Sequence, residues 1–345
     1  MQVQFIQSQT MPATQLLYQA ALELSPTRLL IINAHAHALL TMIREQAGHL
    51  YMHQHQKSEY NALKQSGFPV TVTLPDHSRL YDLVLLRPGK NRQQTHAWMA
   101  EAMNRLQENG QIMVACANHH GGKSYESSLK KMAGNIGSRS KSKCRIFSAR
   151  KTATFNADLA TQWINDAKPQ RIDSHGLIST PGLFSWNRPD PGSSLLLRQL
   201  PALSGIGMDL CCGYGLLAEQ ILYNQADVEQ IHLVEADRLA LDCAIRNTQP
   251  WRQKIHPHWS DAASEPLPEQ LDWIVCNPPF HSGQSRDVDL GQSIALRACK
   301  CLRRGGQLFL VANRKLPYEH LLRSELRQCQ TLIETDGFKV IKGIR

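Results

Sequence analysis

The chain has 345 residues, of which 42% are hydrophobic and 19% charged, and it carries a formal net charge of +9. This length suits two domains, and the composition is that of a globular protein. No apolar stretch approaches the ~20 residues that span a bilayer, and the N-terminus lacks the basic and apolar regions of a secretory signal. We therefore expect a basic, cytoplasmic protein, and the positive charge favours a polyanionic partner.

The cysteines and histidines do not have the spacing of metal ligands. The nine cysteines contain no C-x-x-C pair, which argues against a zinc site or a disulfide framework and favours a reducing compartment. Three histidine pairs have no carboxylate or thiolate at a helpful spacing: His35 and His37, His53 and His55, and His119 and His120. We expect no metal site.

The first half of the chain contains strand-forming segments. Residues 81–90 read "YDLVLLRPGK" and residues 109–118 read "NGQIMVACAN". An earlier apolar segment, "LLIINAHAHALL" at 29–40, contains no glycine. The first half therefore predicts strands without a glycine-rich ligand loop.

A basic segment follows at 130–151, where eight of the residues are Lys or Arg. No acid occurs between Glu126 and Asp158, and arginine alternates with serine and glycine. This pattern makes phosphate contact plausible and gives candidate RNA-binding residues. They are Arg139, Lys141, Lys143 and Arg145. A solvated loop and strand is the alternative interpretation. Residues 156–180 are predicted to connect two domains.

Strand and helix signals alternate regularly in the second half. Strands are predicted at 206–212, 231–237, 271–276, 307–313 and 338–344, with helices at 215–222, 238–247 and 289–302 and another starting at Pro317. Such alternation is typical of a mostly parallel sheet with helices on both faces.

The two halves resemble one another. Residues 81–90 match 271–280, with Asp82 opposite Asp272 and Pro88 opposite Pro278, and 109–118 match 305–313 with one insertion. Two matches in the same order predict an internal duplication, against chance similarity of strands. We expect two tandem Rossmann-like α/β domains, a degenerate one at 1–155 and a catalytic one at 181–345, joined by a linker at 156–180.

Three polar motifs of the second half each follow a predicted strand. The loop Asp209–Gly215, "DLCCGYG", precedes a helix, and its glycines allow a tight turn and close approach of a ligand. Glu235, 26 residues after Asp209, ends the next strand and can accept hydrogen bonds from ribose hydroxyls. Asn277-Pro278-Pro279-Phe280 ends a third strand, because proline cannot extend it. Ligands of open α/β sheets bind at such strand ends.

With this set, the chain resembles the class I S-adenosylmethionine-dependent methyltransferases. Within them it is similar to the ribosomal RNA guanine-N2 methyltransferases of the RsmC and RlmG type over essentially its whole length. The degenerate first copy, residues 180–201, the Asn-Pro-Pro-Phe-His run and "VANRKLPY" at 311–318 carry the resemblance. Total length and "KCRIF" at 143–147 look closer to the small-subunit enzymes.

The resemblance implies S-adenosylmethionine as the cofactor and one guanine of 16S ribosomal RNA, free or in the small ribosomal subunit, as the substrate. We expect the protein to be a monomer. Gly213 and Gly215 would line the methionine end with Asp209 nearby, Glu235 would hold the ribose, Asp261 would face the adenine amino group, and Asn277 to Phe280 would hold the base. Cys211 stands where the family usually has glycine, and its bulk could weaken cofactor binding.

The residues of the Asn-Pro-Pro-Phe motif suit a substrate in which an amine accepts the methyl group. The Asn277 side-chain oxygen and the carbonyls near Pro278 can accept both N–H bonds of a guanine amine, and Phe280 can stack on the base. Other interpretations are methylation of 23S ribosomal RNA, of adenine N6 or of protein glutamine N5. A non-catalytic RNA-binding assembly factor is a further alternative, which predicts decay of both ligand loops.

Overall fold

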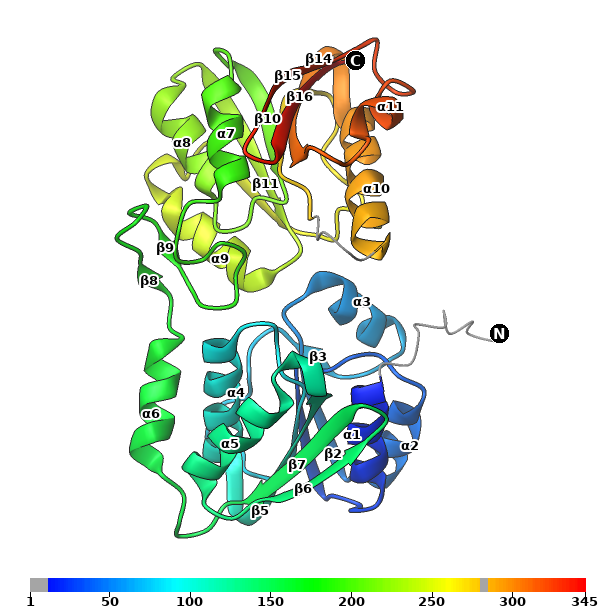
Figure 1. Ribbon diagram of the computed structural model, residues 1–345, viewed down its shortest axis with the longest axis vertical. Helices are drawn as coiled ribbons and strands as arrows, with labels where there is room; N and C mark the ends of the chain where they lie inside the picture. Colours follow the sequence, from blue (N-terminus) through cyan, green and yellow to red (C-terminus); the bar gives the residue numbers. More distant parts are fainter. Residues whose placement is uncertain (1–11, 280–284) are drawn as a thin grey trace. The chain divides into compact units, whose positions relative to one another are not determined.

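The computed structural model describes residues 12–279 and 285–345, and the chain divides into two compact units, Met1–Lys168 and Pro169–Arg345 (Figure 1). The first unit contains α1 (Pro12–Leu22), β1 (Arg28–Ile32), α2 (Leu39–Gln46), β2 (His49–His53), α3 (Lys57–Gln65), β3 (Val70–Thr71), β4 (Tyr81–Leu86), α4 (Arg92–Arg105), β5 (Leu106–Ala117), η1 (Asn118–His120), α5 (Gly122–Ala133), β6 (Gly137–Lys141), β7 (Cys144–Arg150) and α6 (Ala157–Asp166). The second contains β8 (Gln170–Arg171), β9 (Ile178–Ser179), α7 (Pro191–Gln199), β10 (Gly205–Leu210), α8 (Leu216–Asn224), β11 (Val228–Glu235), α9 (Arg238–Asn247), η2 (Gln249–Trp251), β12 (Ile255–Trp259), β13 (Leu271–Cys276), α10 (Ser285–Cys301), β14 (Leu302–Asn313), α11 (Tyr318–Leu322), β15 (Gln328–Thr335) and β16 (Phe338–Ile344).

The two large sheets have the same topology. Their strand orders are β3-β2-β1-β4-β5-β7-β6 and β12-β11-β10-β13-β14-β16-β15, which is one order repeated along the chain. In both sheets the first five strands pair in parallel, and the sixth strand, β7 or β16, pairs antiparallel with both of its neighbours. The prediction of two tandem Rossmann-like domains is confirmed.

Equivalent residues also have equivalent structural roles in the two sheets. The carboxylate of Asp82 accepts hydrogen bonds from the backbone N–H groups of Thr27 and Arg28, at 2.7 and 3.0 Å. The carboxylate of Asp272 accepts one from the Ile206 N–H, at 2.7 Å. Each acid thus ties two central strands together at their amino ends, because it satisfies backbone donors that would otherwise be unpaired.

Helices cover both faces of each sheet, because side chains alternate along a strand. In β13, Ile274 and Cys276 pack into a core with α10 and α11. The intervening Trp273 and Val275 pack into a second core with α7, α8 and α9. Full burial of each large apolar side chain contributes about 1.5–3 kcal/mol, so both faces stabilise the sheet. Figure 1 shows these helix layers.

One sequence expectation is wrong, and two strands of the second sheet were missed. Residues 157–166 are not part of a linker, because they form α6, whose Ala160 and Trp163 belong to the core of the first unit. The strands β12 and β15 were not predicted, since both are edge strands with polar sequences, and β12 contains Pro257. Edge strands tolerate proline and polar residues, so their hydrophobic signal is weak.

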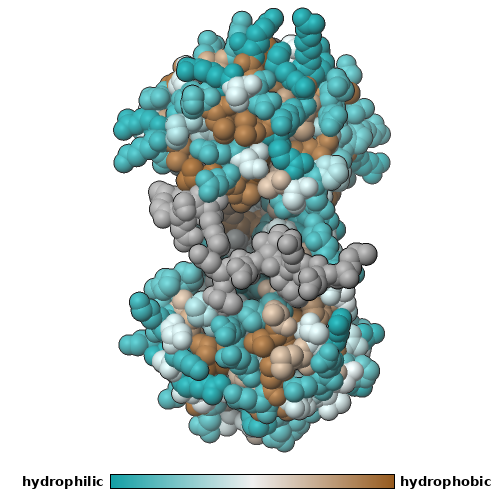
Figure 2. Space-filling model, turned by 90° about the vertical axis from the view of Figure 1, so that its right-hand side faces the viewer, coloured by the Kyte–Doolittle hydropathy of each residue, from teal (hydrophilic) through white to brown (hydrophobic). Residues whose placement is uncertain are grey.

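Figure 2 draws one face of the molecule. On the face in Figure 2, hydrophilic side chains cover most of the surface, with smaller apolar patches among them. No helix within residues 12–279 and 285–345 combines the length and apolarity that a membrane crossing requires.

Gly207 leaves space that the Trp273 ring fills. A Cβ atom at position 207 would lie 2.1 Å from the indole Cε2, which no real contact permits. We predict that Gly207→Ala lowers the free energy of unfolding by about 1–3 kcal/mol, as overpacking does. A shift of the urea midpoint measures this. Gly137→Ala is the control, since its Cβ would meet Ser148 Oγ at an ordinary 3.5 Å. Equal midpoints for the two variants would contradict the packing argument.

Candidate active site

The three predicted motifs meet at the carboxyl edge of the second sheet. Leu210 of β10 is in register with Val234 of β11 on one side and with Cys276 of β13 on the other. The next residues along these strands are Cys211, Glu235 and Asn277. β10 lies between β11 and β13, so the strand order reverses at β10. Open α/β sheets bind ligands at the carboxyl ends of the strands beside such a reversal.

The glycine loop has three residues in the left-handed region. They are Cys211, Gly213 and Gly215, with φ values of 63°, 55° and 87°. A Cβ on Gly215 would lie 3.0 Å from Ala244, so this glycine lets α9 approach the loop. At Gly213 no described atom lies within 4 Å of the Cβ position, so space is open beside the backbone. Cys211 adopts a conformation that costs a residue with a side chain roughly 1–2 kcal/mol.

Glu235 is held against this loop. Its Oε2 accepts a hydrogen bond from the Gly213 N–H and its Oε1 accepts one from the Asp237 N–H, both at 2.8 Å. Burial raises the pKa of Glu235 to about 7, although these backbone donors oppose the shift. Each carboxylate oxygen keeps a lone pair for a ligand hydroxyl.

Asp209 lies beneath the loop and is fully buried. Its Oδ2 accepts a hydrogen bond from the Ala218 N–H in the first turn of α8, at 3.0 Å. Its Oδ1 is buried and has no partner among the described residues. Burial raises the pKa of Asp209 to about 7, and the charge of Glu235 adds to the increase. An orphaned buried oxygen of this kind indicates a missing polar partner.

Asp261 lies near Glu235, because the neighbouring Ser260 N–H donates to the Glu235 carbonyl at 3.0 Å. Its Oδ1 accepts from the Ala263 N–H at 3.0 Å and its Oδ2 accepts from the Ser264 hydroxyl at 2.7 Å. The carboxylate therefore builds a turn, and this orientation leaves it one lone pair or more on each oxygen.

The carboxamide of Asn277 is oriented by two partners that the sequence did not reveal. Its Nδ2 donates to Asp190 Oδ2 at 2.9 Å and to Ser193 Oγ at 2.8 Å. A carboxylate can only accept, so the nitrogen faces Asp190 and the oxygen Oδ1 faces away. Pro278 is buried and Pro279 half-buried, while Phe280 lies outside the described residues.

Asp190 is buried and begins α7. Its Oδ2 also accepts from the Ser193 N–H at 2.7 Å, so one oxygen caps the helix and holds Asn277. The Asp-Pro sequence with proline at the first helical position is a readable N-cap signal. Its position beside the end of β13 is not readable, because the contact joins residues 87 positions apart.

Asn247 is a third residue that the sequence did not reveal. Its Nδ2 donates to the carbonyls of Ile178 and Tyr214, each at 2.8 Å, and its Oδ1 accepts from the Ile178 N–H at 2.7 Å. The Tyr214 ring stacks on His175 with centroids 5.0 Å apart. Asn247 thus fastens the glycine loop to β9.

The corresponding edge of the first sheet is closed by its own side chains. Asn33 follows β1 with a φ of 55°, as Cys211 follows β10. Gln54 occupies the place of Glu235, and its Nε2 donates to Asn33 Oδ1 at 3.2 Å and to the Ala34 carbonyl at 2.8 Å. Asn33 Nδ2 donates to the Arg87 carbonyl at 3.0 Å. These amide contacts join the ends of β1, β2 and β4. The equivalent region of the second sheet carries acids and glycines.

The four predicted RNA-binding residues divide into two groups. Arg139 and Lys141 are exposed on β6, and the exposed Lys143 is in the turn to β7, where Ser142 and Lys143 have positive φ. Arg145 instead forms an ion pair with Glu126 and is half-buried. Glu126 thus largely neutralises the charge of Arg145, whereas Arg139 makes only an exposed ion pair with Glu23, at 3.7 Å.

Both halves of the chain match domains of known proteins. Residues 174–342 match the family described as methyltransferase small domain, and residues 14–166 match its N-terminal domain. The ribosomal RNA small subunit methyltransferase C of Psychromonas ingrahamii is 31% identical over 268 residues, which are 76% of each chain. That of Hahella chejuensis is 32% identical over 206 residues, 59% of each chain, so this match spans less than two thirds of the relative.

A solved structure shares the whole fold. The T. thermophilus 16S rRNA N2 methyltransferase RsmC, in complex with AdoMet and guanosine, has a TM-score of 0.80 and 23% identity, covering 98% of this chain and 92% of that one. The tandem sheets, the glycine loop and the sequence identity lead to one conclusion: the chain belongs to the ribosomal RNA small subunit methyltransferase C family.

Proposed function

We propose that the unit Pro169–Arg345 transfers a methyl group from S-adenosylmethionine to the exocyclic N2 amine of a guanine in 16S ribosomal RNA. The family supports the reaction class. The single observation that carries the proposal is the orientation of Asn277, whose Oδ1 is turned away from Asp190 at the end of β13. An acceptor held in this way can position an amine beside the glycine loop.

The residues at the strand ends fit the cofactor. When bound, S-adenosylmethionine supplies an electrophilic methyl group on a sulfonium. The open space at Gly213 admits a ligand close to the backbone, and the orphaned Oδ1 of Asp209 offers an acceptor to an ammonium or N–H group. Glu235 accepts ribose hydroxyls, and Asp261 faces the adenine amino group in this proposal. Cys211 lies beside the cofactor as a tolerated replacement of glycine.

The chain aligns the target amine. The lone pair of the guanine amine is delocalised into the ring, so the amine is a weak nucleophile. Hydrogen bonds from its two N–H groups to Asn277 Oδ1 and to the carbonyl of Pro278 hold it in one orientation and draw the lone pair out of the ring. Pro278 and Pro279 restrict the backbone at this point. Phe280 stacks on the base, and much of the rate comes from alignment.

The first unit acts as a scaffold that helps to bind RNA. Its strand ends are joined by amide contacts, which supports the loss of chemistry there. The exposed Arg139, Lys141 and Lys143 contact phosphates in this proposal. The protein acts as a monomer in the cytoplasm, where its proposed substrate is made, and it requires no metal.

Asn277→Ala tests the central role. We predict that kcat for methylation of 16S ribosomal RNA falls by about 10²–10³, as when one positioned polar group is removed from an active site. Cofactor affinity, measured by calorimetry, remains within about twofold of wild type, because the contacts of the glycine loop are untouched. Asn224→Ala, in α8, is the control, since among the described residues its side chain bonds only to the Gln220 carbonyl of the same helix. Unchanged turnover by Asn277→Ala would remove the basis of the proposal.

Asp190→Asn tests how Asn277 is positioned. Asparagine caps a helix about as well as aspartate, so the stability of α7 is preserved. The new amide no longer compels Asn277 to present its nitrogen, because an amide can also donate. We predict that kcat falls about tenfold, corresponding to about 1.4 kcal/mol of transition-state stabilisation, with little change in KM and in the urea midpoint. Loss of stability together with activity would indicate a purely structural role.

Glu235 makes cofactor binding depend on pH. Its pKa is raised to about 7 in the folded protein, so the carboxyl is largely protonated at pH 6 and charged at pH 8. Ribose hydroxyls donate more strongly to the charged form. We predict that affinity for S-adenosylmethionine increases up to about tenfold from pH 6 to pH 8. Calorimetry at both pH values measures this increase.

Folding stability changes with pH in the opposite direction to cofactor affinity. A raised carboxyl pKa means that the unliganded fold binds more protons than the unfolded chain, so stability falls as pH rises from about 4.5 through about 7. Glu235→Gln removes the titrating group, so this variant should bind the cofactor weakly with a flatter pH profile. An equally steep profile in Glu235→Gln would assign the titration to another group, Asp209 first, whose pKa is raised similarly.

A further inference from the structure

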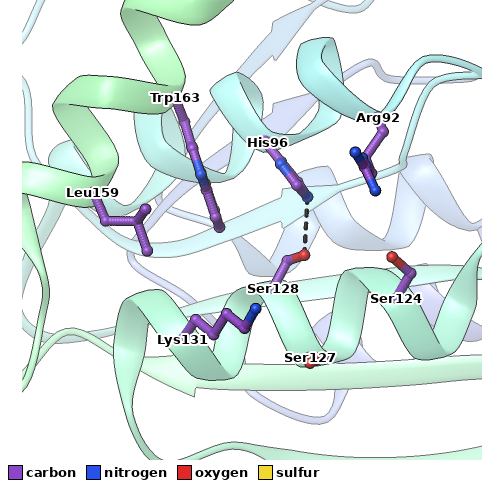
Figure 3. A pocket seen from close by; sticks show the side chains of 8 residues that line it. All are labelled: Arg92, His96, Ser124, Ser127, Ser128, Lys131, Leu159 and Trp163. Carbon is purple, nitrogen blue, oxygen red and sulfur yellow. Dashed lines mark hydrogen bonds between the residues drawn. The ribbon is translucent and has the colours of Figure 1, made fainter.

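A cavity of about 360 Å³ lies within the first unit, between α4, α5 and α6 (Figure 3). Its volume is at the small end of the range for ligand sites. All its lining residues belong to these three helices, so it is separate from the strand ends described above. Nothing in the proposed methyl transfer uses it.

The floor of the cavity is a fixed aromatic layer. The His96 ring of α4 stacks on Trp163 of α6, with centroids 4.3 Å apart and planes 19° apart. His96 Nε2 and the Ser128 hydroxyl of α5 form a hydrogen bond of 2.9 Å, drawn in Figure 3. Three helices thus hold this layer in one arrangement, so its shape is formed before any ligand arrives.

The charges at the cavity are positive and unneutralised. Arg92 and Lys131 line it and are exposed, and neither makes an ion pair with any described residue. No carboxylate lines the cavity, and the nearby Glu126 of α5 is paired with Arg145. Burial, together with these two cations, lowers the pKa of His96 to about 4, so its ring is neutral near pH 7.

We propose that this cavity binds a phosphate group of RNA, between the Arg92 guanidinium and the Lys131 ammonium. The hydroxyls of Ser124 and Ser127 supply further donors, which suits the oxygens of a phosphate. A stacked base is a poorer fit, because Trp163 is buried and His96 covers one face of its ring. The choice of RNA as the source of the phosphate rests on the proposed function.

The helix α6 is essential to this cavity. It follows β7 and contributes Trp163 and Leu159 to the lining. In this proposal the cavity gives the first unit a contact of its own with the substrate.

The test compares two double variants of the full chain. Arg92→Ala with Lys131→Ala removes the cavity cations, and Arg28→Ala with Lys64→Ala removes the same charge from exposed positions elsewhere in the first unit. Binding of a stem–loop fragment of 16S ribosomal RNA is measured against salt concentration. We expect the cavity variant to bind about tenfold more weakly, with a salt slope reduced by about 1–2, while the control changes far less.

Further measurements separate the possible outcomes. Ser124→Asp, at an exposed position, adds a negative charge to the cavity, so weaker RNA binding by this variant supports the site even if the double variant misfolds. Equal RNA binding by the cavity and control variants overturns the proposal. Binding of inorganic phosphate that only the cavity variant loses, with unchanged RNA affinity, also overturns it in favour of a small phosphorylated molecule. Weaker RNA binding in a protein whose wild type transfers no methyl group upholds the cavity and refutes the proposed function.

Discussion

The hydrogen bond from Asn277 to Asp190 is the constraint on which the candidate site depends. A carboxamide offers a donor and an acceptor, and rotation about one bond exchanges them. The Asp190 carboxylate removes this ambiguity because it cannot donate, and Ser193 adds a second contact to the same nitrogen. A hydrogen bond to a charged group contributes about 1.5–3 kcal/mol, which is enough to keep the oxygen directed outward. The start of α7 is therefore part of the site.

Much of this arrangement could be predicted from the sequence, and the reason is the parallel sheet. Parallel strands bring their carboxyl ends to one edge, so a glycine loop, Glu235 and Asn277, each after a strand, had to meet there. Asp190 and Asn247 could not be found in this way, because their contacts join residues 87 and 69 positions apart. The local sequence pattern predicts a helix cap, but it does not predict which distant residues the cap contacts.

The contact partners of charged and of apolar segments could not be read from the sequence either. Arg145 belongs to a run of basic residues, yet Glu126 neutralises it from a neighbouring helix. The segment after Asn156 looked like a connection, although its apolar residues pack as a helix on the first core. In both cases the decisive partner is distant in sequence, and composition alone cannot identify it.

The paired acids Asp82 and Asp272 show how the two halves could diverge so unequally. Each acid binds backbone N–H groups at the amino edge of its sheet, far from the strand ends where ligands bind. Contacts at the amino edge hold the strands together, and the reactive groups lie at the other edge. An ancestral duplicate could therefore exchange its reactive groups for inert amides while its architecture survived. The same division gives protein engineers a tandem scaffold in which one sheet edge can be rebuilt without disturbing the anchor of the strands.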